Sequence, residues 1–350
     1  MTRDELLKHI KDDDTIENCT IDGLSLSGLD LSGGRFRDVI FVDIDFSFCK
    51  IVKTGFMGCS FKNSSFRGVD FEKLGYNGMV MQSCDFREAD LSKTVFNNSD
   101  LGKSDFSGAK LYQASFYKTD FSASVFQNSD CTKITFAKCK MSKTTFLDND
   151  LLSATFFQID MEGAKFINTN LRKCTLMDCA LVEQNFSGMK LNMVQFNNSD
   201  LSGSNFSHAN ISQSNFIGCD LTSCRFNDIE AKNTIFTQAK LKLNDFIHAN
   251  LFQSNFEQVN IEGCDFSGAN IAQSYFVSAN IKDTTFKGAD LKYGNFSHSN
   301  FDNVYMSGSD LSHATIHKAE FKNSNIDEAN CFAIKKTDKD LQEAEEFRYE

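Results

Sequence analysis

Apolar residues recur at every fifth position along nearly the whole chain. Every residue from Ile16 to Cys331 whose number ends in 1 or 6 is apolar, and counting from 16 to 331 in steps of five gives 64 such positions without an insertion or deletion. A period of five is neither the 3.6 of a helix nor the 2 of a strand. A unit this short cannot bury its own side chain, so copies must stack on one another. The pattern predicts a solenoid.

The other four positions of the unit follow from the central one. Residues two places before it are mostly small, as at Ser204, Ala209 and Ser214, and we expect them to point inward beside the central side chain (positions ending in 4 or 9). The positions −1, +1 and +2 should then face water. All twelve cysteines occupy inward positions, which predicts free structural thiols in a reducing compartment, without disulfides or a metal. The cysteines at −2 are Cys19, Cys49, Cys59, Cys84, Cys139, Cys174, Cys179, Cys219, Cys224 and Cys264, and those at the centre are Cys131 and Cys331.

Three blocks carry a recognisable motif: EADLSK at 88–93, GANIAQ at 268–273 and GADLKY at 288–293. They resemble the pentapeptide-repeat family, whose motif is A(D/N)LXX. The resemblance implies an all-β solenoid, a right-handed quadrilateral β-helix with twenty residues per coil and about 16 coils. At roughly 4.8 Å per layer it would be about 77 Å long. Phe206, Phe226 and Phe246 should then stack in one ladder.

The unbroken repeat predicts one domain at 16–331 between two short helical caps. Residues 1–15 should form an N-terminal helix with Leu6, Leu7 and Ile10 on one face, and residues 332–350 a C-terminal helix. In quinolone-resistance members of the family a C-terminal helix makes a dimer, so a homodimer through this helix is an alternative to a simple cap. Residues 71–81 depart most from the repeat and predict a widened or bent coil. Asn149 and Asn244 place amides inward and need partners.

Catalysis is poorly supported by the sequence. Five of the six histidines, His208, His248, His298, His313 and His317, fall at outward positions, and none is accompanied by a nucleophile or acid that a packed solenoid would place in a pocket. No phosphate-binding or zinc-ligand motif is present. Asp and Asn at −1 are expected to bond the backbone at corners. The chain is therefore expected not to be an enzyme and to need no cofactor or metal.

The charge restricts the partners. With 47 acidic and 36 basic residues, a net charge of −11 and a pI near 5.1, direct nucleic-acid binding is not expected. Some family members are acidic rods that mimic DNA and occupy the DNA site of gyrase or topoisomerase IV. B-DNA carries one charge per roughly 1.7 Å, far more than this chain, which argues against mimicry along the whole length. Two hypotheses stay open: a DNA-mimic modulator of a topoisomerase, and a secreted bacterial effector or scaffold that docks a protein.

No apolar run is long enough for a membrane span, and the first residues lack the apolar region of a cleaved signal peptide. We therefore expect a cytoplasmic protein, with export as an effector as the alternative. The expected docking surface consists of apolar residues at the outward +1 position and of lysines beside them. Its members are Tyr112, Tyr117, Leu152, Phe157, Met177, Lys118, Lys133, Lys138 and Lys173.

Overall fold

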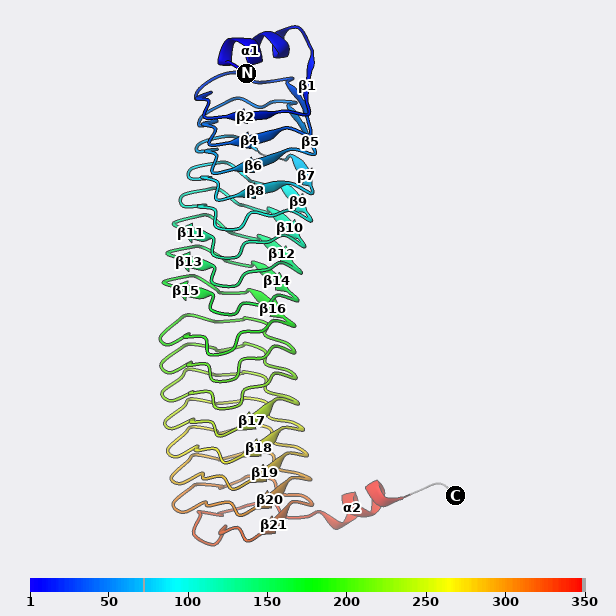
Figure 1. The fold of residues 1–350 in the computed structure, drawn as a ribbon. Helices are drawn as coiled ribbons and strands as arrows, with labels where there is room; N and C mark the ends of the chain where they lie inside the picture. Colours follow the sequence, from blue (N-terminus) through cyan, green and yellow to red (C-terminus); the bar gives the residue numbers. More distant parts are fainter. Residues whose placement is uncertain (72, 348–350) are drawn as a thin grey trace. The chain divides into compact units, whose positions relative to one another are not determined.

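The computed structural model describes residues 1–71 and 73–347 and divides into two compact units, Met1–Thr175 and Leu176–Glu350. Each unit is a parallel β-solenoid in which residues twenty apart in sequence pair side by side (Figure 1). The predicted all-β solenoid with a short helix at each end is confirmed. Residue 72 of the irregular segment and residues 348–350 of the predicted C-terminal segment lie outside the described residues.

The first unit begins with helix α1 (Arg3–Lys11) and continues with short strands of three residues each. One sheet contains β1 (Thr15–Glu17), β3 (Arg35–Arg37) and β5 (Gly55–Met57), and a second contains β2 (Thr20–Asp22), β4 (Ile40–Val42), β6 (Ser60–Lys62) and β8 (Val80–Gln82). A third contains β7 (Gly75–Asn77), β9 (Val95–Asn97), β10 (Ser115–Tyr117), β12 (Thr135–Ala137) and β14 (Thr155–Phe157). A fourth contains β11 (Val125–Gln127), β13 (Thr145–Leu147) and β15 (Lys165–Ile167).

Strand β16 (Thr175–Met177) begins on the last residue of the first unit. The second unit carries one sheet of named strands, with single bridges between the coils elsewhere. The sheet contains β17 (Lys240–Lys242), β18 (Asn260–Glu262), β19 (Asn280–Lys282), β20 (Asn300–Asp302) and β21 (Glu320–Lys322). Helix α2 (Lys339–Glu346) follows the last coil.

Central side chains fill the interior of both units, and the phenylalanines among them form ladders of stacked rings. Phe206 and Phe226 stack with centroids 5.0 Å apart, and Phe226 and Phe246 with centroids 4.7 Å apart, all three fully buried. The predicted ladder is therefore confirmed. Each coil repeats the one before it because the five-residue spacing never slips, and burial of these rings supplies the main driving force for folding.

The small residues at −2 do more than leave space. Their hydroxyl and thiol groups donate to the carbonyl of the central residue 23 positions earlier, as Ser124 does to Leu101 at 3.0 Å and Cys174 to Leu151 at 2.9 Å. A buried hydroxyl without such a partner would be costly. Ser, Thr and Cys suit this position because they are small and carry one hydrogen-bond donor.

The corners of the coil are made at the +2 position. Residues there adopt a left-handed backbone, from Asp13 (φ 62°) to Ala333 (φ 54°), in both units. This conformation costs most residues about 1–2 kcal/mol, and 15 of the 20 glycines occupy it. At Gly68 the glycine has a second reason, since the ring of Phe48 lies where a Cβ would stand.

The ladder of the first unit is interrupted in the irregular segment. Strands β5 and β7 are twenty residues apart in sequence, yet they belong to different sheets. Phe56 and Tyr76, the central rings of these strands, are only partly buried, and Gly55 and Gly75 beside them present no side chain. The pairing of strands is therefore interrupted between this segment and the preceding coil, and the widened or bent coil expected for residues 71–81 stays a prediction.

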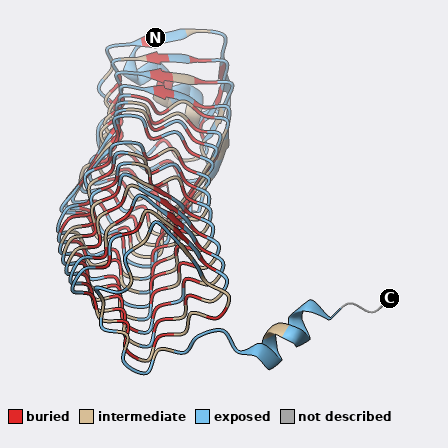
Figure 2. Cartoon of the chain, turned by 90° about the horizontal axis from the view of Figure 1, so that it is seen from below, coloured by how far each residue is buried: buried red, intermediate tan, exposed pale blue. Residues whose placement is uncertain are grey.

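The two terminal helices differ in what they cover. Helix α1 lies against the first coil and buries Leu6 completely (Figure 1). Helix α2 buries none of its residues and extends to the side of the last coil (Figure 2). Consequently Phe321, Ile326 and Cys331, which are central residues, stay partly exposed. Among the described residues, no helix has the length and hydropathy that crossing a membrane requires.

Candidate interaction surface

The outward +1 and +2 positions of the first unit carry most of the predicted docking residues. Strand pairing places Tyr117, Ala137 and Phe157 side by side on β10, β12 and β14. Tyr117 is exposed and Phe157 is half-buried. Ala137 separates the two rings by one coil, so Tyr117 and Phe157 share a column, as predicted, without being immediate neighbours.

Tyr112 and Leu152 lie in the turns that precede β10 and β14. The backbone bonds from Gln113 to Thr132 and from Lys133 to Leu152 fix the two residues in one column, with Thr132 between them. Both side chains are half-buried. The first unit thus carries two apolar columns, one on the strands and one in the turns before them. Met177 belongs to the second unit, so its grouping with the other four stays a prediction.

Lysines cover part of this apolar surface. The Lys118 ammonium lies 5.2 Å from the centre of the Tyr117 ring, and the Lys133 ammonium lies 5.8 Å from that of Tyr112. Cation–π contacts at exposed sites are worth about 0.5–1 kcal/mol. Lys138 and Lys173 are also exposed. The surface is therefore aromatic and cationic together, where the sequence predicted an apolar patch with a charged rim.

Aspartates at the −1 position of the first unit accept hydrogen bonds from the backbone. The Asp90 carboxylate accepts the backbone N–H of Ser92 at 3.0 Å, and Asp120 accepts that of Ser122 at 2.8 Å. Asp100, Asp130 and Asp150 accept in the same way. Lysines also approach these columns, with Lys110 at 3.6 Å from Asp90 and Lys140 at 4.0 Å from Asp120. The backbone bonds are those expected for Asp at −1, and the lysines partly neutralise Asp90 and Asp120.

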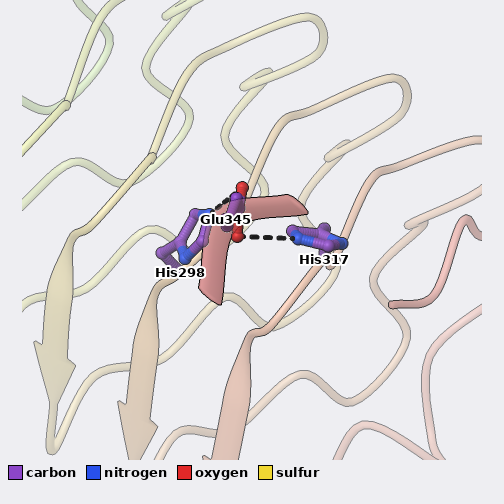
Figure 3. Close-up of side chains that lie close together, drawn as sticks. All are labelled: His298, His317 and Glu345. Atoms are coloured by element: carbon purple, nitrogen blue, oxygen red, sulfur yellow. Dashed lines mark hydrogen bonds and ion pairs between the residues drawn. The ribbon is translucent and has the colours of Figure 1, made fainter. Parts of the chain in front are cut away.

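A second cluster, found only in the structure, joins α2 to the side of the last coils (Figure 3). One oxygen of Glu345 lies 3.3 Å from His298 Nε2, and the other lies 3.4 Å from His317 Nε2 and 3.0 Å from the Lys318 ammonium. The hydrogen bond from Lys318, followed by the contacts with the histidines, lowers the pKa of Glu345 to about 2. His317 is 3% exposed, so the expectation that it faces water is wrong: the turn before α2 and the helix cover it.

Three of these side chains, His298, His317 and Glu345, bring donor atoms within 4.8 Å of one another, a spacing that could hold a metal ion. His317 Nδ1 accepts the backbone N–H of Asp338 at 3.1 Å, which places the ring proton on Nε2, the atom that faces Glu345. A metal would require Nε2 without its proton. The ammonium of Lys318 would also repel a cation bound to Glu345. The geometry fits a latch for α2 better than it fits a metal centre.

Comparisons agree with the stacked coils. The family described as pentapeptide repeat region matches residues 129–206, 209–286 and 259–332, and the family described as pentapeptide repeats (8 copies) matches residues 84–122 and 104–142. No curated protein matches the sequence.

Solved structures that resemble the chain are distant in sequence. A structure of QnrB1, a plasmid-mediated fluoroquinolone resistance protein, is 16% identical over 69% of this chain and 90% of its own, with a TM-score of 0.28. HetL, involved in heterocyst differentiation regulation in the cyanobacterium Nostoc, is 16% identical over 94% of this chain and 96% of its own, with a TM-score of 0.13. The assignment rests on the matched repeats, which cover more than half of the sequence. The chain belongs to the pentapeptide-repeat family.

Proposed function

We propose that the chain is a non-catalytic scaffold that binds another protein through the aromatic and cationic surface of its first unit. One observation carries the proposal: Tyr112, Tyr117, Leu152 and Phe157 occupy outward positions that polar residues usually fill, and they lie in two columns, with one coil between the two members of each column. The interior is filled by stacked side chains, so the outer surface is where a partner would act. Aromatic residues are enriched at the centre of contact surfaces, and charged residues such as lysine belong to the polar rim.

The partner should present acidic and apolar groups. Residues 101–200 carry 11 basic and 10 acidic side chains, whereas residues 1–100 carry 12 basic and 17 acidic ones. The surface therefore lies in the part of the sequence that repels an acidic protein least. Electrostatic complementarity of this kind mainly sets the association rate and the choice of partner.

A DNA topoisomerase is the partner class that the family suggests, and DNA mimicry is the mechanism it would imply. The acidic excess of residues 1–100 and of residues 201–350, where 20 acidic side chains accompany 13 basic ones, supports a mimic that uses one end of the chain. The paired carboxylates of Asp90 and Asp120 speak against a mimic in the middle of the first unit. Modulation of gyrase is therefore a hypothesis about the partner, separate from the scaffold role.

Two assays test these hypotheses separately. A gyrase supercoiling assay with the full chain tests the partner class, and an absence of any effect on supercoiling rejects it. For the scaffold, a photo-cross-linking residue is placed at Tyr117 and, as a control, at Tyr305, which is also exposed but lies in the second unit. We expect a discrete heteromeric adduct at Tyr117 alone, which Phe157→Ser weakens. Equal cross-linking at both positions, or no adduct at Tyr117, would reject the docking surface.

Self-association is a second candidate function, favoured by the last coil. Phe332 is 70% exposed there, and the central residues Phe321, Ile326 and Cys331 are partly exposed because α2 does not cover them. An uncovered end also presents unpaired backbone groups. A second copy packed on this end would give a homodimer through the last coil, whereas the family resemblance suggested a homodimer through the C-terminal helix. Light scattering of the full chain should then show twice the monomer mass of 39.3 kDa, and Phe332→Asp should restore the monomer.

A further inference from the structure

The second unit carries a groove that neither the repeat nor the proposed docking surface accounts for. It has a volume of about 520 Å³ and is lined by Asn233, Gln253, Gln273, Tyr275 and Tyr293. Asn233, Gln253, Gln273 and Tyr293 are the +2 residues of four successive coils. Tyr275 stands at the −1 position, directly before the central residue Phe276. Cavities of roughly 300–1,000 Å³ are typical of small-molecule sites.

The lining is polar without being charged. It consists of three amides and two phenols, and each amide offers both donors and acceptors. Two lysines adjoin lining residues in sequence, and both ammonium groups are paired: Lys232 lies 3.6 Å from Glu230, and Lys292 lies 3.5 Å from Asp290 and 3.4 Å from Asp310. The groove therefore offers no carboxylate to a cation and no ammonium to an anion. Its chemistry suits a neutral ligand rich in hydroxyl groups.

The amides are arranged in a ladder along the groove. The Gln253 side-chain NH₂ donates to the Gln273 side-chain carbonyl at 2.9 Å, so one amide orients the next. Tyr293 is the next residue of the same column, and its ring stacks on His313 with centroids 4.9 Å apart and 5° between the planes. Pre-oriented groups lose little side-chain entropy when a ligand binds.

Tyr275 supplies an accessible ring on the other side. It is 53% exposed, and its column neighbours Asn255 and Asn295 fold back to accept backbone N–H groups two residues on. The short side chains of Asn255 and Asn295 are therefore hydrogen-bonded to the backbone of their own turns. A sugar ring combines hydroxyl edges, which amides bind, with C–H faces that pack on aromatic rings. Asn233 to Tyr293 span four coils, roughly 14 Å at the spacing of strands, the length of a short oligosaccharide.

We propose that this groove binds a neutral oligosaccharide, with Gln253 and Gln273 hydrogen-bonding its hydroxyl groups and Tyr275 and Tyr293 packing against its rings. This site lies in the second unit and is independent of the docking surface on the first. An extended peptide is the competing occupant, because a ladder of amides can also bond a peptide backbone.

Calorimetric titration of the full chain with cellohexaose, maltohexaose, laminarihexaose, xylohexaose and chitohexaose tests the proposal. We expect at least one to bind, and Tyr275→Ala with Tyr293→Ala to weaken binding at least tenfold. Tyr305→Ala is the matched control, since Tyr305 is 54% exposed in the same unit and does not line the groove. Both tyrosines of the groove are more than half exposed, so their loss should leave the fold intact, which thermal melting checks.

Gln273→Leu provides a second test that removes no ring. It should weaken the same sugar while leaving the melting temperature unchanged. The proposal is overturned if none of the five sugars binds, or if the double tyrosine variant binds as tightly as the wild type. It is equally overturned if a hexapeptide composed of Gly, Asn and Gln binds at the groove and the sugars do not.

Discussion

At the −2 position, one polar atom decides how well a side chain suits the interior. Ser129 and Thr169 lie one coil before and one coil after Asn149 in the same column, and their hydroxyls donate to Phe106 and Phe146. Asn149 reaches only the Ser129 carbonyl, at 3.5 Å, and its Oδ1 has no partner among the described residues. A buried acceptor left unpaired costs about 1–3 kcal/mol. Of the two inward amides expected to need partners, Asn149 is the one whose carbonyl oxygen has none among the described residues.

Replacing Asn149 by Thr should therefore stabilise the protein. Thr has nearly the volume of Asn, and its hydroxyl would donate to the Phe126 carbonyl as Thr169 does one coil later. We expect the free energy of unfolding to rise by about 1–3 kcal/mol, measured in denaturant melts. Asn244→Thr is the control, because the Asn244 amide donates to Leu221 and Cys224 and accepts from Cys264. Equal gains from both substitutions would contradict the argument.

The five-residue pattern predicted the interior but not its hydrogen bonds. A repeat without insertions fixes which residues lie one coil apart, so the ladder of Phe206, Phe226 and Phe246 followed from their numbers alone. The partner of a −2 hydroxyl depends on its distance to the previous coil, which the pattern does not contain. The left-handed turns did leave a signal, since most glycines fall at +2.

At the scale of elements, α2 is held by charge and not by packing. None of its residues is buried, and Glu345 with Glu346 provides its ion pairs with Lys318, His298 and His317. The sequence could not predict this contact because residues after Cys331 leave the repeat and their direction is no longer set by it. For the same reason the burial of His317 could not be read from its +1 position.

Docking of α2 should weaken in acid. Hydrogen bonding by Lys318 and His317, together with electrostatic attraction by His298, lowers the pKa of Glu345 to about 2, against an ordinary value of 4.5. The contribution of Glu345 is therefore complete above about pH 4.5 and is lost as the pH falls from there toward 2. Hydrogen exchange of the α2 amides, corrected for the intrinsic rate, should accelerate across this range. Glu345→Gln should be fast already at neutral pH, and high salt should also accelerate the wild type.

Glu343→Gln is the matched control for this prediction, because Glu343 lies on the same helix and has no ion pair with the solenoid among the described residues. It should exchange like the wild type at neutral pH and accelerate in acid as the wild type does. A helix that exchanges at the same rate in Glu345→Gln and Glu343→Gln would show that the latch does not hold α2.

At the scale of the whole molecule, the interior of each unit is filled and its surface is varied. The first unit presents aromatic rings with lysines, and the second presents an uncharged groove and a partly exposed last coil. The sequence predicted the first surface because rings at +1 break the polar pattern. It could not predict the groove, because Asn, Gln and Tyr at outward positions are ordinary until the turns bring them together.

Both units have buried cysteines, so the reactivity of the thiols measures how closed each interior is. All twelve were expected to point inward: ten are buried, whereas Cys19 and Cys331, at the first and last coils, are only partly buried. Burial raises the pKa of the thiol to about 11 for Cys49 and about 12 for Cys84 and Cys224. Because the thiolate is the reactive form, these groups should be inert near neutral pH.

A thiol reagent should therefore modify two cysteines of the native protein quickly and the other ten only after unfolding, and mass spectrometry counts them directly. The raised pKa values also predict a loss of stability in alkali. Burial favours the neutral thiol, so its contribution is complete below the ordinary pKa of 9.0 and is lost as the pH rises toward 11–12. Between these values the unfolded chain binds fewer protons than the folded one, and the ten slow thiols should begin to react together within each unit. Fast labelling of Cys84 or Cys224 at neutral pH would mean that the coils open locally and that the interior is less closed than its stacked rings imply.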